Sequence, residues 1–147
     1  MAAFVWQVRV YYEDTDAGGV VYHANYLNYL ERARTEWMRA RGLEQDRLIS
    51  DQGIIFAVRS VNLEFIKPAR FNQRLRVEVD IAQANRLAIQ FTQRVLLQNG
   101  DGAETVHQAD VLLCAANVKV VTLDAANMRP RRMPNPIFVE IMRGHGN

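Results

Sequence analysis

Alternating apolar and polar residues predict a strand at the start of the chain. From Phe4 to Tyr12 every second residue is apolar or aromatic, so one face of an extended segment would be wholly hydrophobic. The run ends in a cluster of turn formers between Glu13 and Gly19. We therefore expect a strand over residues 4–14 that packs one face on a core and leads into a loop.

A helical period follows this loop. Apolar residues recur at steps of four, three and four from Tyr26 to Trp37, which places them in one stripe of an amphipathic helix. Gly42 is a natural stop, and the helix begins either at Asn25 or a turn earlier near residue 22. Residues 43–50 are expected to form a short second helix or a loop.

Beyond residue 53 the pattern changes back to alternation. The expected strands cover residues 54–66, 75–84, 88–98 and 104–123, with a hairpin turn at 99–102 and a last helical turn at 137–142. One strand, one long helix and four consecutive strands with short links favour an antiparallel sheet. We therefore predict a single α+β domain over 1–147, in which the helix covers one face of the sheet.

Composition narrows the class of protein further. Apolar residues make up 49% and charged residues 23% of the chain, which is ordinary for a globular protein. No apolar run approaches the ~20 residues of a membrane helix, and we read no signal peptide at the N-terminus. The single cysteine, Cys114, lies in an apolar strand, so we expect a buried structural thiol and a reducing cytoplasm.

The charge of the chain gives only a weak indication of what the protein binds. The formal net charge of +2 is too small to argue for nucleic acid. Between residues 59 and 94, however, seven basic residues stand against three acidic ones. Arginine binds phosphate through two hydrogen bonds, so the excess suits a phosphorylated ligand, although a solvated sheet face or codon bias is the more ordinary explanation of any single arginine.

The loop before the predicted helix contains more residues suited to catalysis than any other segment of the chain. Asp14 and Asp16 lie two residues apart, and the adjacent Gly18 and Gly19 allow a ligand to approach the backbone closely. The helix N-terminus just beyond offers unpaired N–H groups and the positive end of a dipole. A carboxylate facing such a helix end can attack a carbonyl or activate water while the N–H groups polarise the carbonyl. On spacing alone, the alternative is that Asp14 and Asp16 only form turns and cap the helix.

A longer signature runs through this segment. The pattern Tyr-x-x-x-Asp-x-x-Gly-x-Val-x-x-x-x-Tyr, followed by Glu-x-Ala-Arg, is met by Tyr12, Asp16, Gly19, Val21, Tyr26, Glu31, Ala33 and Arg34. Phe-Ile-Lys-Pro-Ala at 65–69 matches a later strand end. The chain thus resembles the hotdog-fold acyl-CoA thioesterases of the 4-hydroxybenzoyl-CoA thioesterase type, in particular the Tol-Pal-associated, YbgC-like branch.

The resemblance implies a hotdog fold, in which a five-stranded antiparallel sheet wraps one long central helix and paired subunits share their active sites. It implies that Asp16 is the catalytic carboxylate, acting as base or nucleophile, that His23 assists catalysis at the helix start, and that Tyr12 belongs to the catalytic site. The expected substrate-binding residues are Gly19, Val20, Tyr26, Arg70 and Arg86, the two arginines on charge clustering alone.

The implied activity is hydrolysis of an acyl-CoA to free acid and CoA by a cytoplasmic homodimer or tetramer of dimers, with acyl carrier protein as a further partner. We expect no cofactor and no metal, because a thiolate leaves readily and no His or Cys pair has metal-ligand spacing. The alternatives are a hotdog acyl carrier protein dehydratase and a non-catalytic, envelope-linked scaffold. Asp16 speaks against the scaffold, and the absence of Gly-x-Ser-x-Gly excludes a serine hydrolase of the α/β kind.

Overall fold

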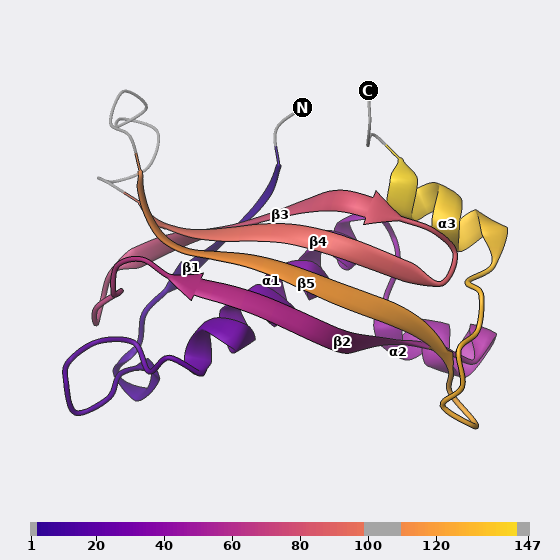
Figure 1. Cartoon of the computed structure of the whole chain (residues 1–147), viewed down its shortest axis with the longest axis horizontal. Coiled ribbons are helices and arrows are strands. Elements are labelled where there is room, and N and C mark those ends of the chain that lie inside the picture. The colour runs from indigo at the N-terminus through magenta and orange to yellow at the C-terminus, as the bar shows by residue number, and fades with distance from the viewer. Residues whose placement is uncertain (1–2, 99–109, 144–147) are drawn as a thin grey trace.

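Five antiparallel strands and one long helix form the body of the protein (Figure 1). The computed structural model describes residues 3–98 and 110–143. The strands are β1 (Phe4–Arg9), β2 (Ile54–Phe65), β3 (Arg74–Ala84), β4 (Ala88–Leu97) and β5 (Val111–Asp124). The helical elements are a 3-10 turn at Tyr12–Asp14, α1 (Asn25–Ala40), α2 (Gln45–Arg47), a π-helical turn at Leu48–Gln52 and α3 (Asn135–Met142).

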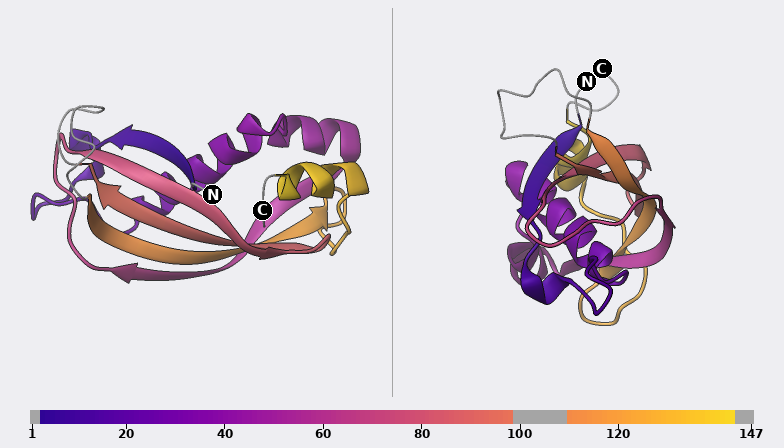
Figure 2. Two further views of the ribbon diagram at one scale, coloured as in Figure 1. Left: turned by 90° about the horizontal axis from the view of Figure 1, so that it is seen from above. Right: turned by 90° about the vertical axis from the view of Figure 1, so that its left-hand side faces the viewer.

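The sheet has the strand order β1-β3-β4-β5-β2. Strands β3, β4 and β5 form a meander, while β1 and β2, which flank α1 in the sequence, lie at the two opposite edges. The sheet curves, and α1 lies across its concave side (Figure 2). This is the five-stranded sheet around a central helix that the sequence predicted.

The apolar stripe of α1 makes the core. Tyr29, Leu30 and Ala33 are fully buried, and Trp37 meets Phe91 of β4 edge to face with ring centroids 5.2 Å apart. The inward-facing residues of β3 and β4 are almost completely buried as well. The stripe read from the sequence is therefore the face that α1 presents to the sheet.

The first strand is shorter than predicted. It ends at Arg9, which pairs with Arg74, the first residue of β3. Val10 still exchanges backbone hydrogen bonds of 2.9 Å with Gln73 and Asn72, the two residues before β3. The Asp14 carboxylate accepts a hydrogen bond of 2.8 Å from the Tyr11 N–H, which favours the 3-10 turn over an extended chain. Tyr12 consequently points to solvent, 81% exposed, instead of continuing the buried face.

The other predicted elements agree with the structure within one or two residues, where they can be compared. Helix α1 begins at Asn25, the later of the two expected starts. Residues 43–50 contain the short helix α2, and the C-terminal turn is α3. The hairpin turn at 99–102 and the first part of the predicted strand 104–123 lie outside the described residues. Within the described ranges no helix has the length and apolar character needed to cross a membrane.

Candidate active site

The loop between β1 and α1 is a tight turn around Asp16. The Asp16 N–H donates to the Val20 carbonyl at 2.9 Å, and the Gly19 N–H donates to the Asp16 carbonyl at 3.0 Å. Gly19 has a φ of +79°, which a residue with a side chain adopts only under strain. The Gly18 N–H donates to Asp16 Oδ1 at 2.8 Å. One carboxylate oxygen is thus held by the loop, while the side chain as a whole stays exposed.

The loop leads directly into the N-terminus of α1. The Tyr22 N–H donates to the Asp14 carbonyl at 2.9 Å, and the Asn25 N–H donates to the Tyr22 carbonyl at 2.8 Å. Between them, the N–H groups of His23 and Ala24 have no acceptor in the described part of the chain. They stand at the positive end of a 16-residue helix, where a developing negative charge is stabilised.

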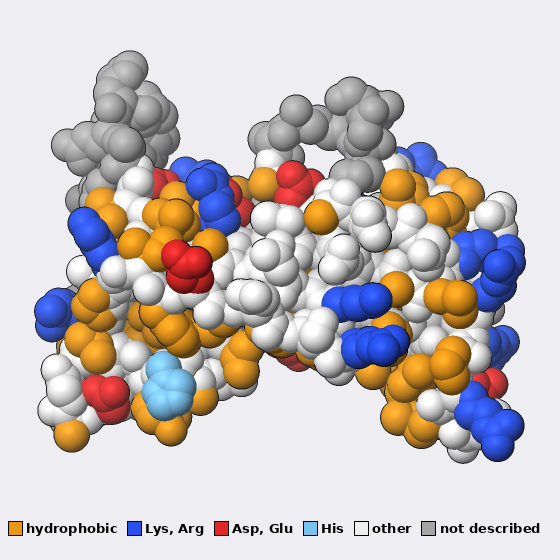
Figure 3. Space-filling view, in the orientation of Figure 1, with side chains coloured by type: hydrophobic (Ala, Val, Ile, Leu, Met, Phe, Trp, Pro, Cys, Tyr) orange, Lys and Arg blue, Asp and Glu red, His pale blue; other side chains and the backbone are white. Residues whose placement is uncertain are grey.

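A hollow of about 480 Å³ lies beside the Asp16 carboxylate. Its walls are Tyr12, Thr15, Asp16, Ala17, Gly19 and Phe71. The rings of Tyr12 and Phe71 meet edge to face with centroids 5.8 Å apart, and both are largely exposed. In the space-filling view, hydrophobic side chains gather at the end of the molecule that carries this loop (Figure 3). The hollow therefore combines a carboxylate with apolar walls, which suits an acyl thioester.

The structure brings most of the predicted site residues together. Tyr12, Asp16 and Gly19 line the hollow, and Val20 forms an antiparallel bridge with Arg70 beside it. His23 is exposed in the turn before α1, with its ring against that of Tyr22 at a centroid distance of 4.6 Å.

Two predicted binding residues lie elsewhere. Tyr26 is buried, and its hydroxyl accepts the Ala69 N–H at 3.0 Å, so it supports the segment after β2 from below. Arg86 follows β3 at the end of the sheet remote from this loop, where its Nε donates to the Met133 carbonyl at 2.8 Å. A single chain therefore does not bring Arg86 to the hollow.

Three wall residues were not among the predicted site residues. Thr15 and Ala17 belong to the predicted loop itself, whereas Phe71 comes from a distant segment. Phe71 reaches the hollow because the Val20–Arg70 bridge joins two segments about fifty residues apart in the chain. A contact of this kind leaves no trace in local periodicity. The only signal was an apolar residue in a loop rich in turn formers, which is common on protein surfaces.

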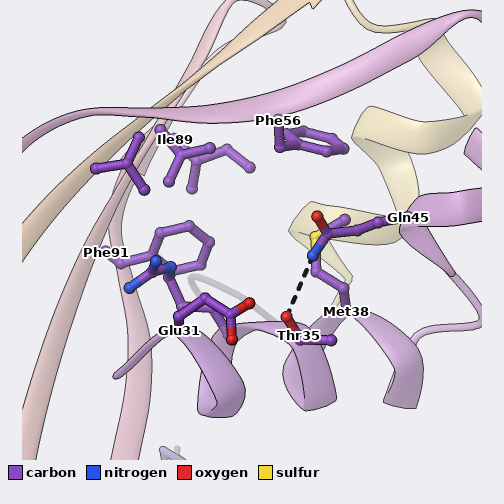
Figure 4. Close-up of a pocket in the computed structure, with 10 residues that line it drawn as sticks. Glu31, Thr35, Met38, Gln45, Phe56, Ile89 and Phe91 are labelled. Carbon is purple, nitrogen blue, oxygen red and sulfur yellow. Dashed lines mark hydrogen bonds between the residues drawn. The ribbon is translucent and has the colours of Figure 1, made fainter. Parts of the chain in front are cut away.

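A second cavity, of about 150 Å³, lies between α1 and the sheet (Figure 4). Glu31, Thr35 and Met38 of α1 face Phe56 of β2 and Phe91 of β4 across it. The Gln45 side chain closes one end and donates to Thr35 Oγ1 at 3.4 Å.

The signature residue Arg34 also borders this cavity. Its guanidinium donates to the Gln93 side chain at 3.0 Å, and Gln93 in turn donates to the Leu30 carbonyl at 3.1 Å. Burial lowers the pKa of Arg34, an effect that nearby Glu31 opposes. Arg34 of the signature therefore helps to hold α1 on the sheet through a polar network with Gln93 and the Leu30 carbonyl.

The remaining candidates for a nucleophile or a metal site are weak. Cys114 is fully buried in β5, and burial raises the pKa of its thiol to about 11, as expected of a structural thiol rather than a nucleophile. In the described ranges no three His, Cys, Asp or Glu side chains are grouped to hold a metal ion.

Comparison with known proteins identifies the family of this chain. The family model described as the thioesterase-like superfamily matches residues 10–139. The acyl-CoA thioester hydrolase YbgC of Escherichia coli O157:H7 is 41% identical over 137 residues, which cover 93% of this chain and 94% of that protein. The acyl-CoA thioesterase YbgC of Haemophilus influenzae is 37% identical, with 91% and 90% covered.

Solved structures agree in fold. A probable thioesterase from Bartonella henselae superposes with a TM-score of 0.79 at 31% identity, covering 90% of this chain and all 100% of the other. A 4-hydroxybenzoyl CoA thioesterase mutant in complex with 4-hydroxybenzoyl CoA gives a TM-score of 0.81 at 20% identity, covering 95% and 99%, a likeness of fold alone. On the family match and these relatives, the chain belongs to the thioesterase-like superfamily and is a hotdog-fold acyl-CoA thioesterase.

Proposed function

We propose that Asp16 carries out the hydrolysis of acyl-CoA in this enzyme, with the start of α1 as the site that polarises the thioester carbonyl. The observation behind the proposal is the arrangement of one loop. An exposed carboxylate, held through one oxygen by the Gly18 N–H, stands in the same turn that feeds the two unpaired N–H groups of His23 and Ala24.

The chemistry requires only these groups. The carboxylate either takes a proton from water, which attacks the carbonyl carbon, or attacks the carbon itself to form a mixed anhydride that water then cleaves. In both routes the C–S bond breaks and the electron pair leaves with the CoA sulfur. We expect the His23 imidazole to supply a proton to that thiolate and the His23 backbone N–H to stabilise the carbonyl oxygen. Tyr12 and Phe71 flank the acyl or pantetheine part.

Asp16→Asn tests this role. The amide oxygen of asparagine can still accept the Gly18 N–H, so the loop keeps its shape while the base or nucleophile is lost. We expect kcat to fall by ~10² or more, measured by thiol release over a panel of acyl-CoAs from acetyl to palmitoyl and benzoyl. Asp80→Asn is the matched control, since its Oδ1 also accepts a neighbouring backbone N–H, that of Ile81 at 2.9 Å. A kcat of Asp16→Asn within about threefold of wild type, ~0.7 kcal/mol, would refute the assignment.

We also propose that the enzyme is a homodimer paired along β2. This strand hydrogen-bonds to β5 on one side and forms an edge of the sheet on the other. The strand from its fifth residue onward and the residue after it carry exposed apolar side chains, at Val58, Val61, Phe65 and Ile66. An apolar strand edge of this length calls for a partner. Phe65 also contacts Tyr26 of α1, at 5.4 Å between ring centroids, so a subunit docked here would lie near the catalytic loop.

Further expectations rest on the resemblance alone. They are a cytoplasmic location, an acyl carrier protein partner, association with the Tol-Pal proteins of the envelope, and assembly of dimers into a tetramer. Each stays a prediction. Arg70, beside the hollow, is the better placed of the two predicted arginines to meet a CoA phosphate in the same chain.

A further inference from the structure

The cavity between α1 and the sheet is closed at one end by a single pair of side chains. Gln45, the first residue of α2, donates a hydrogen bond of 3.4 Å to Thr35 Oγ1 on α1 (Figure 4). A second hollow, of about 250 Å³ and bordered mostly by polar and charged side chains, lies against the same two residues. Thr35 and Gln45 line both spaces, so this pair of side chains separates them.

The cavity between α1 and the sheet is suited to a hydrocarbon chain. Ile89 and Phe91 of β4 and Val120 of β5 line it on the sheet side, and all three are buried. Its volume is about 150 Å³, and an apolar protein cavity of ~150 Å³ holds a benzene molecule, so there is room for roughly six carbon atoms. Phe56 and Val58 of β2 complete the wall. Val58 is 49% exposed, so the cavity opens toward the edge strand.

The proposed dimer brings this opening to a catalytic loop. Two β2 strands that pair edge to edge around a two-fold axis perpendicular to the sheet run antiparallel, so the first half of one strand lies beside the second half of the other. Phe56 and Val58 belong to the first half, whereas the second half ends at Phe65, whose ring contacts Tyr26 at the start of α1. The cavity of one subunit therefore opens toward the loop that carries Asp16 of the partner subunit.

We propose that Gln45 sets the length of the acyl group that the enzyme accepts. The acyl chain enters the cavity at the β2 edge, and its end meets the Gln45 side chain at the far end. The Thr35 hydroxyl gives the Gln45 amide a hydrogen-bond partner, so the amide can stay at the end of an apolar space. Without this side chain the cavity would continue into the second hollow and admit a longer chain. The inference rests on the proposed function, in particular on the pairing along β2.

The test is the acyl-chain profile of Gln45→Ala. The kcat/KM for thiol release is measured with saturated acyl-CoAs of even length from acetyl to palmitoyl. In the wild type we expect kcat/KM to drop at least ~10-fold between two neighbouring members, because one methylene group too many for a pocket costs about 10- to 200-fold. In Gln45→Ala this drop should move to a longer acyl-CoA by at least one member. Each profile is normalised to its own best substrate, so a smaller folded fraction does not alter it.

Two further variants serve as controls. Gln45→Met keeps a side chain of similar length without the amide, so the drop should stay where the wild type has it. Gln52→Ala removes an exposed glutamine from the turn after α2, which borders neither space, and should also leave the profile unchanged. A Gln45→Ala profile that drops at the wild-type length would overturn the inference, as would a wild-type profile without a drop. A shift in either control equal to that in Gln45→Ala would do so too, because its cause would not be the space vacated at Gln45.

Sedimentation of the same preparations and a parallel assay of Asp16→Asn separate this inference from the proposed function. A dimer with an unshifted Gln45→Ala profile refutes the role of Gln45 only. A folded, active monomer refutes the pairing along β2 and this inference with it, because the cavity would then open toward no catalytic loop. A fully active Asp16→Asn beside a shifted Gln45→Ala profile refutes the role of Asp16 and supports that of Gln45.

Discussion

Gly18 offers a way to move the Asp16 carboxylate, the proposed catalytic group, without removing it. A methyl group built on Gly18 would lie 3.2 Å from Asp16 Oδ1, the same oxygen that accepts the Gly18 N–H at 2.8 Å. Ordinary contacts of a Cβ begin at about 3.4 Å, so the carboxylate has to give way by a few tenths of an ångström. Gly18 is not among the glycines with positive φ, so its backbone accepts alanine without strain. Gly18→Ala therefore changes the position of the Asp16 carboxylate and little else.

The size of the effect follows from this displacement. A misplacement of about 1 Å in a reacting group can cost ~10² in rate, so a few tenths should cost about 10-fold in kcat. The fold should not suffer, because replacing glycine by alanine at a compatible φ typically adds about 0.4–1 kcal/mol of stability through the unfolded chain.

Gly19→Ala is the natural comparison. Its methyl group would meet no atom within 4 Å, but the φ of +79° makes alanine strained, by about 1–2 kcal/mol. We expect the melting temperature to fall by several degrees in Gly19→Ala and not in Gly18→Ala. Steady-state thiol release and thermal unfolding on both variants supply the data. A folded Gly18→Ala enzyme with kcat within twofold of wild type would show that the orientation of Asp16 does not limit turnover, which contradicts the mechanism.

Three further predictions concern His23, Tyr26 and assembly. His23→Ala keeps the backbone N–H, so we expect measurable activity reduced by ~10- to 10³-fold; unchanged kcat with a lowered melting temperature would make the side chain structural. Tyr26→Phe leaves the fully buried N–H of Ala69 without its acceptor, so thermal unfolding should report a loss of about 1–3 kcal/mol, and an unaltered melting temperature would contradict that reading. Sedimentation at low micromolar concentration should show a dimer; a folded monomer of 16.8 kDa would exclude it.

Periodicity was sufficient for most of the fold. The step of four, three and four over 26–37 marks the buried stripe of α1, and alternation marks β3, because a residue's place in a regular element decides which face it shows. The same rule failed after Arg9. The strand there ends where its neighbour β3 begins, and the Asp14 side chain turns the chain, two facts that depend on pairing and on one hydrogen bond.

The residues of the candidate site also divide into those that a local sequence pattern can predict and those that it cannot. Tyr12, Asp16 and Gly19 fall in one short segment, so a sequence signature could name them together. Phe71 joins them through a bridge between distant segments, and Arg86 is carried to the far end by the length of β3. Clustering of charge along the sequence therefore says little about which arginines meet in space.

The strand order has a consequence for how the chain folds. The meander of β3, β4 and β5 joins neighbours in sequence, so its loops close at small entropic cost and it can form early. Strands β1 and β2 pair with partners about fifty to seventy-five residues away, at opposite edges. The loop that carries Asp16 and helix α1 lie between these two strands in the sequence, and the two strands are expected to dock late. The hollow beside Asp16 therefore comes into being only when the slowest contacts have formed, so a partly folded chain, even one with a complete meander, is catalytically silent.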